Sequence, residues 1–348
     1  MKKVAIIGGG FAGSKIAKSL ENDFDVTLID TKDYFEFTPS ILSAITDPAC
    51  LEDIQIMHTH YLKKAKVIIG RAEKISGNEV FVGKRKIKFD YLAISSGSKY
   101  SFPFKEHDAL ITSRANRLRN HYEDLHNSKN VLIIGGGLSG VELAAEIATK
   151  CHDKKITIVH AMDRLIERQP EKASEYAKRF LEKKGVKIIF NELIKGNRKV
   201  RSKENFFTDR GKKIESDIAF LCVGITPNSD FIRKSFPKLV DKKGYASTDE
   251  SLNLKGFRNI FVGGDVTDIK EEKTAQNSIE HAKVIASNII NLERGKPLNK
   301  YVHKERAMIL SLGRHRGILT YKNFVIAGII PSMIKRHIQN KEMGSLKG

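Results

Sequence analysis

Two glycine-rich segments with the same spacing are the part of this sequence that most clearly carries chemistry. In each, four apolar residues precede a hexapeptide with glycines at its first, third and sixth positions: Gly8, Gly10 and Gly13 in one, and Gly135, Gly137 and Gly140 in the other. The first glycine allows a tight turn, the second lets the backbone approach a pyrophosphate, and the third lets a helix pack closely on a strand. The phosphates then lie at the amino end of that helix. These two glycine fingerprints predict two dinucleotides in one chain, which suits the passage of a hydride between them.

The residue that ends the next strand differs between the two fingerprints. After the first, an apolar strand pattern over residues 26–29 ends at Asp30, about 20 residues past the glycines, where an acid is expected to bind the ribose hydroxyls of adenosine. After the second, the strand pattern over residues 155–159 ends at His160. NAD-specific enzymes carry there an acid that repels a 2′-phosphate, so we expect both NADH and NADPH to be used, with His160 and Arg164 facing the phosphate. The alternative is that Asp163 supplies the acid.

Further motifs follow in a recognisable order. Residues 259–265 have the pattern of a strand that ends in Gly264-Asp265, and a helix pattern covers residues 274–282. Residues 89–98 and 219–228 each form an apolar strand followed by a glycine-containing loop. By this order, from Gly8 to about Ala282, the chain resembles the pyridine nucleotide-disulfide oxidoreductase-like flavoproteins. As a whole it is similar to the type II NADH:quinone oxidoreductases, and most similar to their ferroptosis-suppressor (apoptosis-inducing-factor-like, mitochondrion-associated 2) branch. Ser95-Ser96 stands where that family usually has Ala-Thr.

The resemblance implies an α/β fold with two Rossmann-like dinucleotide-binding domains, the NAD(P) domain being inserted into the FAD domain. Residues 1–105 and 240–300 would form the FAD domain, and residues 106–239 the NAD(P) domain. Residues 301–348 would be a small C-terminal appendage, serving as a membrane-interface or dimerisation segment. Asp265 would bind a ribityl hydroxyl of FAD, and the helix after it would point its amino end at the flavin.

The expected site residues fall into two cofactor sets. FAD would be bound by the first fingerprint, by loops after neighbouring strands and by the Gly-Asp motif, that is by Gly8, Gly10, Phe11, Ala12, Gly13, Asp30, Thr31, Lys32, Pro39, Ala72, Ser96, Gly97, Gly264, Asp265 and Ala275. NADH or NADPH would be bound by the second fingerprint and the strand ends beside it, that is by Gly135, Gly137, Leu138, Ser139, Gly140, His160, Arg164, Val223 and Gly224. No metal site is expected.

Two polar residues are candidates for a direct role in the reaction. Glu142 follows the second fingerprint, and the resemblance places it where nicotinamide and flavin meet; the alternative is an acid that only stabilises the start of a helix. Gln276, after Ala275, matches the quinone-side helix of the family and could donate to a quinone carbonyl, or could be an ordinary polar residue near a helix start. The loop containing Pro39 would lie along the flavin, or would be an ordinary loop with buried aromatic residues.

The cysteines exclude several related activities. The chain has three, Cys50, Cys151 and Cys222, and no two have the short spacing of a redox-active pair. Cys50 comes too late to match the single-cysteine oxidases and peroxidases of the superfamily, and nothing after Cys222 matches the late cysteine of sulfide:quinone oxidoreductases. We therefore expect the three to be small buried residues.

Charge and apolar patterning suggest a membrane surface. The chain has 348 residues, 41% of them hydrophobic, and a net charge of +20. No apolar run reaches the roughly 18 residues that span a bilayer, and Lys2-Lys3 leads into the first fingerprint rather than a signal peptide. Residues 324–334 are apolar and are followed by Lys335-Arg336, which is typical of a segment in the membrane interface. The alternative is a buried strand with ordinary surface lysines. We expect a cytoplasmic protein, peripheral on the inner face of the cell membrane.

These observations predict an FAD-dependent NAD(P)H:quinone oxidoreductase that works without a thiol and transfers two electrons from NAD(P)H through flavin to a quinone. Two alternatives remain open. One is a reductase of a soluble acidic electron carrier of the ferredoxin or rubredoxin type, which would explain the charge equally well. The other is a basic, apoptosis-inducing-factor-like flavoprotein that binds nucleic acid, although no specific nucleic-acid motif is present. A homodimer is possible.

Overall fold

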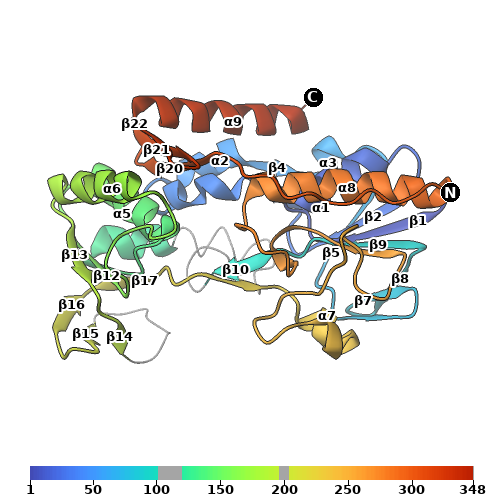
Figure 1. The fold of residues 1–348 in the computed structure, drawn as a ribbon, viewed down its shortest axis with the longest axis horizontal. Helices are drawn as coiled ribbons and strands as arrows, with labels where there is room; N and C mark the ends of the chain where they lie inside the picture. Colours follow the sequence, from blue (N-terminus) through green and yellow to red (C-terminus); the bar gives the residue numbers. More distant parts are fainter. Residues whose placement is uncertain (101–119, 196–203, 348) are drawn as a thin grey trace.

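The computed structural model describes residues 1–100, 120–195 and 204–347 of the chain and contains two parallel sheets flanked by helices. The first sheet has the order β19-β9-β1-β2-β5, formed by β1 (Lys3–Ile7), β2 (Asp25–Asp30), β5 (Lys66–Ile69), β9 (Tyr91–Ile94) and β19 (Ile260–Val262). The second has the order β13-β12-β11-β17, formed by β11 (Asn130–Ile134), β12 (Lys155–His160), β13 (Lys187–Phe190) and β17 (Ile218–Leu221). Figure 1 shows them at opposite ends of the molecule. The predicted α/β fold with two Rossmann-like domains is confirmed.

The first sheet is buried on both faces because its strands are apolar without alternation. Val4 and Ile6 of β1 belong to the core cluster that contains α1 (Phe11–Leu20) and α8 (Ala275–Glu293). The alternate residues Ala5 and Ile7 belong to the cluster on the opposite face, with β7 (Glu79–Val82). In the second domain α5 (Leu138–Lys150) and α6 (Glu171–Lys183) pack on the sheet in the same way.

The second sheet is inserted between two strands of the first. Strand β19 follows all of the second sheet along the chain, yet it pairs in parallel with β9. One predicted domain limit, at 105/106, lies outside the described residues. Near the other limit, α7 (Asp230–Ser235) packs with the first domain, because Ser235 Oγ accepts a hydrogen bond from the Ile75 amide at 2.7 Å.

Smaller elements complete both domains. The remaining strands are β3 (Tyr34–Glu36), β4 (Gln55–Met57), β6 (Lys74–Ser76), β8 (Arg85–Lys88), β10 (Ser98–Tyr100), β14 (Ile194–Lys195), β15 (Glu204–Thr208), β16 (Lys213–Ser216) and β18 (Ile225–Pro227). The short helices are η1 (Thr38–Ile45), η2 (Pro48–Cys50), α2 (Leu51–Ile54), α3 (His58–Tyr61), η3 (Pro237–Leu239) and η4 (Gly264–Val266). Strands β10 and β18 pair antiparallel and connect the two domains.

The C-terminal segment is a three-stranded antiparallel sheet followed by a long helix. It comprises β20 (Met308–Leu312), β21 (Arg316–Tyr321), β22 (Phe324–Gly328) and α9 (Ile329–Lys347). Leu310 and Leu312 belong to the core of the second domain, whereas Met343 and Leu346 belong to that of the first. Helix α9 thus runs across both domains, as Figure 1 shows.

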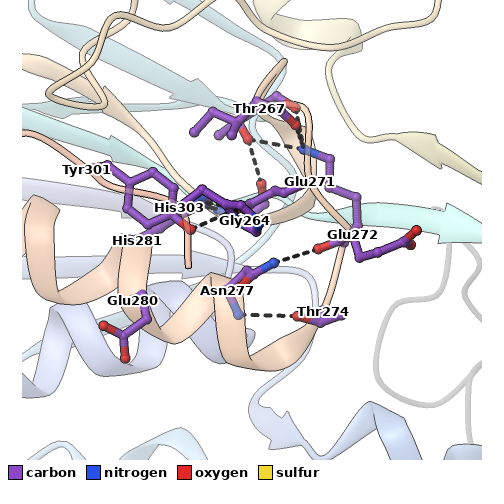
Figure 2. Close-up of polar contacts among 12 residues, drawn as sticks. Gly264, Thr267, Glu271, Glu272, Thr274, Asn277, Glu280, His281, Tyr301 and His303 are labelled. Carbon is purple, nitrogen blue, oxygen red and sulfur yellow. Dashed lines mark hydrogen bonds and ion pairs between the residues drawn. The ribbon is translucent and has the colours of Figure 1, made fainter. Parts of the chain in front are cut away.

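A buried carboxylate fixes the chain between α8 and β20 to the first domain. Glu271 Oε1 lies 3.0 Å from His281 Nε2, and Glu271 Oε2 accepts hydrogen bonds from the Tyr301 hydroxyl and from His303 Nδ1, both at 2.7 Å. His281 Nδ1 in turn accepts the Gly264 amide at 2.9 Å, as drawn in Figure 2. Burial alone would raise the pKa of Glu271, but the hydrogen bonds from the two histidines and the tyrosine lower the pKa to about 2. We call Glu271, His281, Tyr301 and His303 the Glu271 cluster.

The Glu271 cluster predicts a specific loss of stability in acid. Because the folded-state pKa lies below the ordinary value, the stabilisation is complete above the unfolded pKa and is lost as the pH falls through it toward the folded pKa. At neutral pH the ionised Glu271 should contribute roughly 3 kcal/mol to the free energy of unfolding. About 2 kcal/mol of this contribution should be lost between about pH 6 and about pH 3. The difference in unfolding free energy between the parent and Glu271→Gln, measured by urea unfolding, should shrink by this amount. A difference that stays constant with pH would contradict the prediction; exposed Glu215→Gln is the control.

Candidate functional site

A cavity of about 680 Å³ lies between the two domains and the C-terminal segment. Most of the predicted FAD residues line it: Gly8, Gly10, Phe11, Ala12, Asp30, Thr31, Lys32, Pro39, Ser96, Gly97, Gly264, Asp265 and Ala275. Leu138, Ser139, Glu142 and Gln276 line it as well. The other predicted residues are not among its lining residues: Gly13, Ala72, Gly135, Gly137, Gly140, His160, Arg164, Val223 and Gly224. We call this the main cavity.

The glycines of the first fingerprint have the three geometries that a phosphate-binding turn needs. Gly8 has a φ of +97°, and a Cβ there would lie 2.2 Å from the Ser95 carbonyl oxygen. A Cβ on Gly13 would lie 1.7 Å from the Gly8 carbonyl oxygen, so that helix and turn touch directly. At Gly10, the residue before α1, a Cβ would meet nothing within 4 Å. The backbone beside the helix start is therefore open toward the cavity, as a bound pyrophosphate requires.

The second fingerprint repeats this geometry. Gly135 has a φ of +110°, and a Cβ on Gly140 would lie 1.9 Å from the Gly135 carbonyl oxygen, while nothing lies within 4 Å at Gly137. Val223 and Gly224 follow β17 beside this turn, since a Cβ on Gly135 would lie 2.4 Å from the Cys222 carbonyl oxygen. The second helix start is thus equally open to phosphate.

Asp30 is held as an anion at the end of β2. Its Oδ2 accepts the Gly9 amide at 3.0 Å and lies 3.2 Å from Nε2 of the fully buried His58, whose Nδ1 lies 2.7 Å from the Tyr61 hydroxyl. Burial would raise the pKa of Asp30, but the His58 hydrogen bond, the nearby Lys32 charge and the Thr31 amide lower it. An anionic carboxylate at this position can accept both ribose hydroxyls. His58 and Tyr61 were not identified from the sequence, because nothing near them in the chain indicates their contact with Asp30.

His160 takes the place of Asp30 in the second domain. Its Nδ1 accepts the Gly136 amide at 3.1 Å, as Asp30 accepts the Gly9 amide, and its Nε2 lies 3.4 Å from Glu167 Oε2. Arg164, which is expected to face a phosphate, donates to the carbonyl oxygens of Glu167 and Gln169. The carboxylate beside His160 is therefore that of Glu167, which the sequence analysis did not consider.

Glu142 is coupled to the C-terminal segment. Its Oε1 accepts hydrogen bonds from the Ser311 amide at 2.8 Å and from Lys335 Nζ at 2.7 Å, and both charged side chains are mostly buried. Gln276 is the second residue of α8 and lines the same cavity. The structure therefore brings the two candidate reactive residues to one cavity. Lys335 was interpreted from the sequence as a surface charge, since its partner is far away in the chain.

The cysteines lie in surroundings that favour the neutral thiol. Burial raises the pKa of Cys222 to about 12 and, together with the charge of Asp47, that of Cys50 to about 11. Burial also raises the pKa of Cys151. Cys50 lines a second cavity of about 700 Å³, which shares Glu142 and Lys335 with the main cavity. Within the described parts of the chain, no group of three or more histidines, cysteines and acids is placed to hold a metal ion.

The residues of the main cavity fit FAD. The open turn at Gly10 suits the pyrophosphate and the anionic Asp30 suits the ribose. Asp265, at η4, accepts from the Ser98 hydroxyl at 2.6 Å and lines the cavity where a ribityl chain would follow. Helix α8 begins at Ala275, where the Thr274 hydroxyl accepts the Asn277 amide, and directs its amino end into the cavity.

Comparison with known proteins agrees with this geometry. Residues 2–285 match the family model described as pyridine nucleotide-disulphide oxidoreductase. Apoptosis-inducing factor homolog B of Dictyostelium discoideum is 31% identical over 335 residues, covering 89% of this chain and 87% of that protein. Ferroptosis suppressor protein 1 of Homo sapiens is 27% identical over 349 residues, covering 95% and 92%.

Solved structures show the same fold. The sulfide:quinone oxidoreductase of Aquifex aeolicus has a TM-score of 0.83 at 19% identity, covering 100% of this chain and 92% of that one. NDH2 of Plasmodium falciparum, solved in complex with NADH, has a TM-score of 0.82 at 14% identity, covering 99% and 96%. The chain therefore belongs to the pyridine nucleotide-disulphide oxidoreductase family, and it is a flavoprotein that uses FAD and NAD(P)H for oxidoreduction.

Proposed function

We propose that this protein is a non-thiol NAD(P)H:quinone oxidoreductase. The observation that carries the proposal is the position of Glu142 and Gln276 in one cavity with the FAD-binding residues, while the three cysteines are held as neutral thiols. Two relatives support it, since one fold neighbour is named a sulfide:quinone oxidoreductase and the chain aligns with ferroptosis suppressor protein 1 over almost its whole length.

The residues have distinct roles in this mechanism. FAD, when bound, supplies the group that accepts a hydride and passes on two electrons. Gly10, Asp30 and Asp265 would hold it, and the turn at Gly137 would hold the phosphates of NAD(P)H. Glu142, fixed by Lys335 and the Ser311 amide, would orient the reacting rings. The Gln276 amide would donate to a carbonyl oxygen of the quinone.

An exposed apolar patch supports a location on a membrane surface. Phe324, Ile329 and Ile330, in β22 and the first turn of α9, are 76%, 58% and 61% exposed, and Lys322 beside them is exposed as well. The apolar run is therefore an exposed strand and helix start rather than a buried strand. Helix α9 also lines both cavities through Lys335, so that a lipophilic quinone leaving the bilayer would reach the site along it. No helix in the described residues is long and apolar enough to cross a membrane.

The proposal is tested by the choice of electron acceptor. The purified flavoprotein should oxidise NADH or NADPH with a quinone as acceptor faster than with ferredoxin, rubredoxin or oxygen. The net charge of +20 would suit the binding of an acidic carrier protein. Faster turnover with such a carrier would show that the carrier, and not a quinone, is the electron acceptor. Binding of nucleic acid without quinone reduction would support the remaining alternative.

Glu142→Gln should slow quinone reduction while FAD stays bound. The glutamine side chain can still accept the hydrogen bond from the Ser311 backbone amide, but it lacks the charge that pairs with Lys335. Loss of this charged contact should cost about 1.5–3 kcal/mol, or roughly 10–100-fold in turnover. The matched control is Glu146→Gln, one helical turn later and paired with Lys150. Equal rates of quinone reduction by both variants, with FAD content and unfolding unchanged, would show that Glu142 only stabilises the helix start.

Ile329→Ser combined with Ile330→Ser should weaken binding to anionic liposomes by about tenfold or more, because two exposed apolar side chains that enter the bilayer interface are removed. Ferricyanide reduction should not change. A second double variant, Leu193→Ser with Phe207→Ser, removes similarly exposed side chains from another face and should bind like the parent. Unchanged liposome binding of the first variant, or its conversion of a dimer to a monomer, would show that the patch does not serve a membrane.

NADH and NADPH should be used with specificity constants within about a factor of ten, or roughly 1.4 kcal/mol. Since Glu167 is the carboxylate beside His160, Glu167→Gln should raise the ratio for NADPH over NADH, and His160→Glu should lower it. Asp163→Asn should leave the ratio unchanged. A shift with Asp163→Asn but not with Glu167→Gln would make Asp163 the selector instead.

A further inference from the structure

His303 is the member of the Glu271 cluster that reaches the main cavity. It lies between α8 and β20, its side chain is 42% exposed, and it lines the cavity, whereas Glu271 and His281 are each 1% exposed. Because a carboxylate only accepts, the 2.7 Å contact means that His303 Nδ1 donates to Glu271 Oε2. The carboxylate thereby fixes the ring, and Nε2 is the ring nitrogen that this contact leaves unused.

The other cluster members cannot exchange protons with the cavity in the same way. His281 uses Nδ1 to accept the Gly264 amide and directs Nε2 to Glu271. Tyr301 donates to Glu271, and burial together with that hydrogen bond and charge raises the pKa of the phenol far above its usual value. Among these side chains, His303 alone combines a fixed ring with a place in the lining of the main cavity.

The reaction needs one proton beyond the hydride. NAD(P)H gives a hydride, which carries two electrons and one proton, and reduction of a quinone to a quinol takes two electrons and two protons. The second proton must come from solvent, through a group that is neither fully buried nor randomly oriented. We propose, on the basis of the function proposed above, that His303 delivers this proton from Nε2 to a quinone oxygen and is then reprotonated from solvent, with Glu271 as its positioning residue.

The charges around His303 make this exchange feasible. Lys304 and Arg306 lie on the same segment, and Lys273 lies on the loop before α8, all lining the cavity. Arg306 is 3.6 Å from Glu280 of α8, which also pairs with Lys283, and Lys273 Nζ donates to the Thr267 and Ile269 carbonyl oxygens. Arg306 and Lys273 are thus engaged by other acceptors, whereas the Glu271 carboxylate contacts His303 directly.

The test compares quinone with ferricyanide, which takes electrons without protons. His303→Asn should slow quinone reduction at least about tenfold and remove the fall in rate at alkaline pH that loss of a proton donor causes in the parent. Ferricyanide reduction and FAD content should stay at the parent values, and exposed His152→Asn should behave as the parent in every assay. Glu271→Gln should also slow quinone reduction more than ferricyanide reduction, because the His303 ring loses the carboxylate that fixes it. Histidine-ring NMR should show one resonance that disappears in His303→Asn and changes its chemical shift in Glu271→Gln, because the contact with the carboxylate is lost.

Three results would overturn the proposal. Equal slowing of quinone and ferricyanide by His303→Asn would assign the residue a structural role only. A quinone rate and pH profile identical to the parent would exclude it from proton delivery. A parent protein that reduces ferricyanide but no quinone would overturn the proposed function and the proton path with it. The first two results, by contrast, would overturn only the role of His303.

Discussion

The contact between the third and first glycines of each fingerprint is the constraint on which the site depends. A Cβ on Gly13 or Gly140 would lie within 2 Å of the carbonyl oxygen of Gly8 or Gly135, so neither position tolerates a side chain. This contact holds each helix start against the end of its strand. The same turns leave the backbone open at Gly10 and Gly137. Two places for phosphate are therefore created by the absence of side chains, and every other site residue is arranged around them.

The C-terminal segment links these two places. Its β20 and α9 pack into the cores of both domains and supply the Ser311 amide and Lys335 to Glu142. Because the ion pair between Glu142 and Lys335 is mostly buried, removing either partner would leave an uncompensated charge. The segment that exposes the apolar patch therefore also fixes the Glu142 carboxylate at the main cavity. On this account, contact with a membrane and the chemistry of the site involve the same helix.

The sequence predicted those parts of the site that depend on local patterns. The two fingerprints and Asp30 follow from strand, glycine and acid spacing within short segments, whereas the inserted second domain was implied by the order of motifs shared with the family. The fold class and family are confirmed. The sequence did not reveal His58 behind Asp30, Glu167 beside His160, or Lys335 beside Glu142, because each pair is formed by tertiary packing. The sequence did not decide whether the apolar run that begins at Phe324 is a buried strand or a membrane-interface segment, because apolar composition alone does not determine whether a strand is covered. The assignment of individual residues to cofactors stays a prediction.

The central claim is that the reduced flavoprotein passes its electrons directly to a quinone. The most direct measurement is anaerobic: the protein is reduced with one equivalent of NADH, mixed with one equivalent of quinone, and followed by flavin absorbance, in the parent and in a variant with all three cysteines replaced by serine. We expect full recovery of the oxidised flavin spectrum and one equivalent of quinol in both proteins. Flavin that stays reduced in the presence of quinone, or reoxidation that is lost with the cysteines while FAD remains bound, would contradict it.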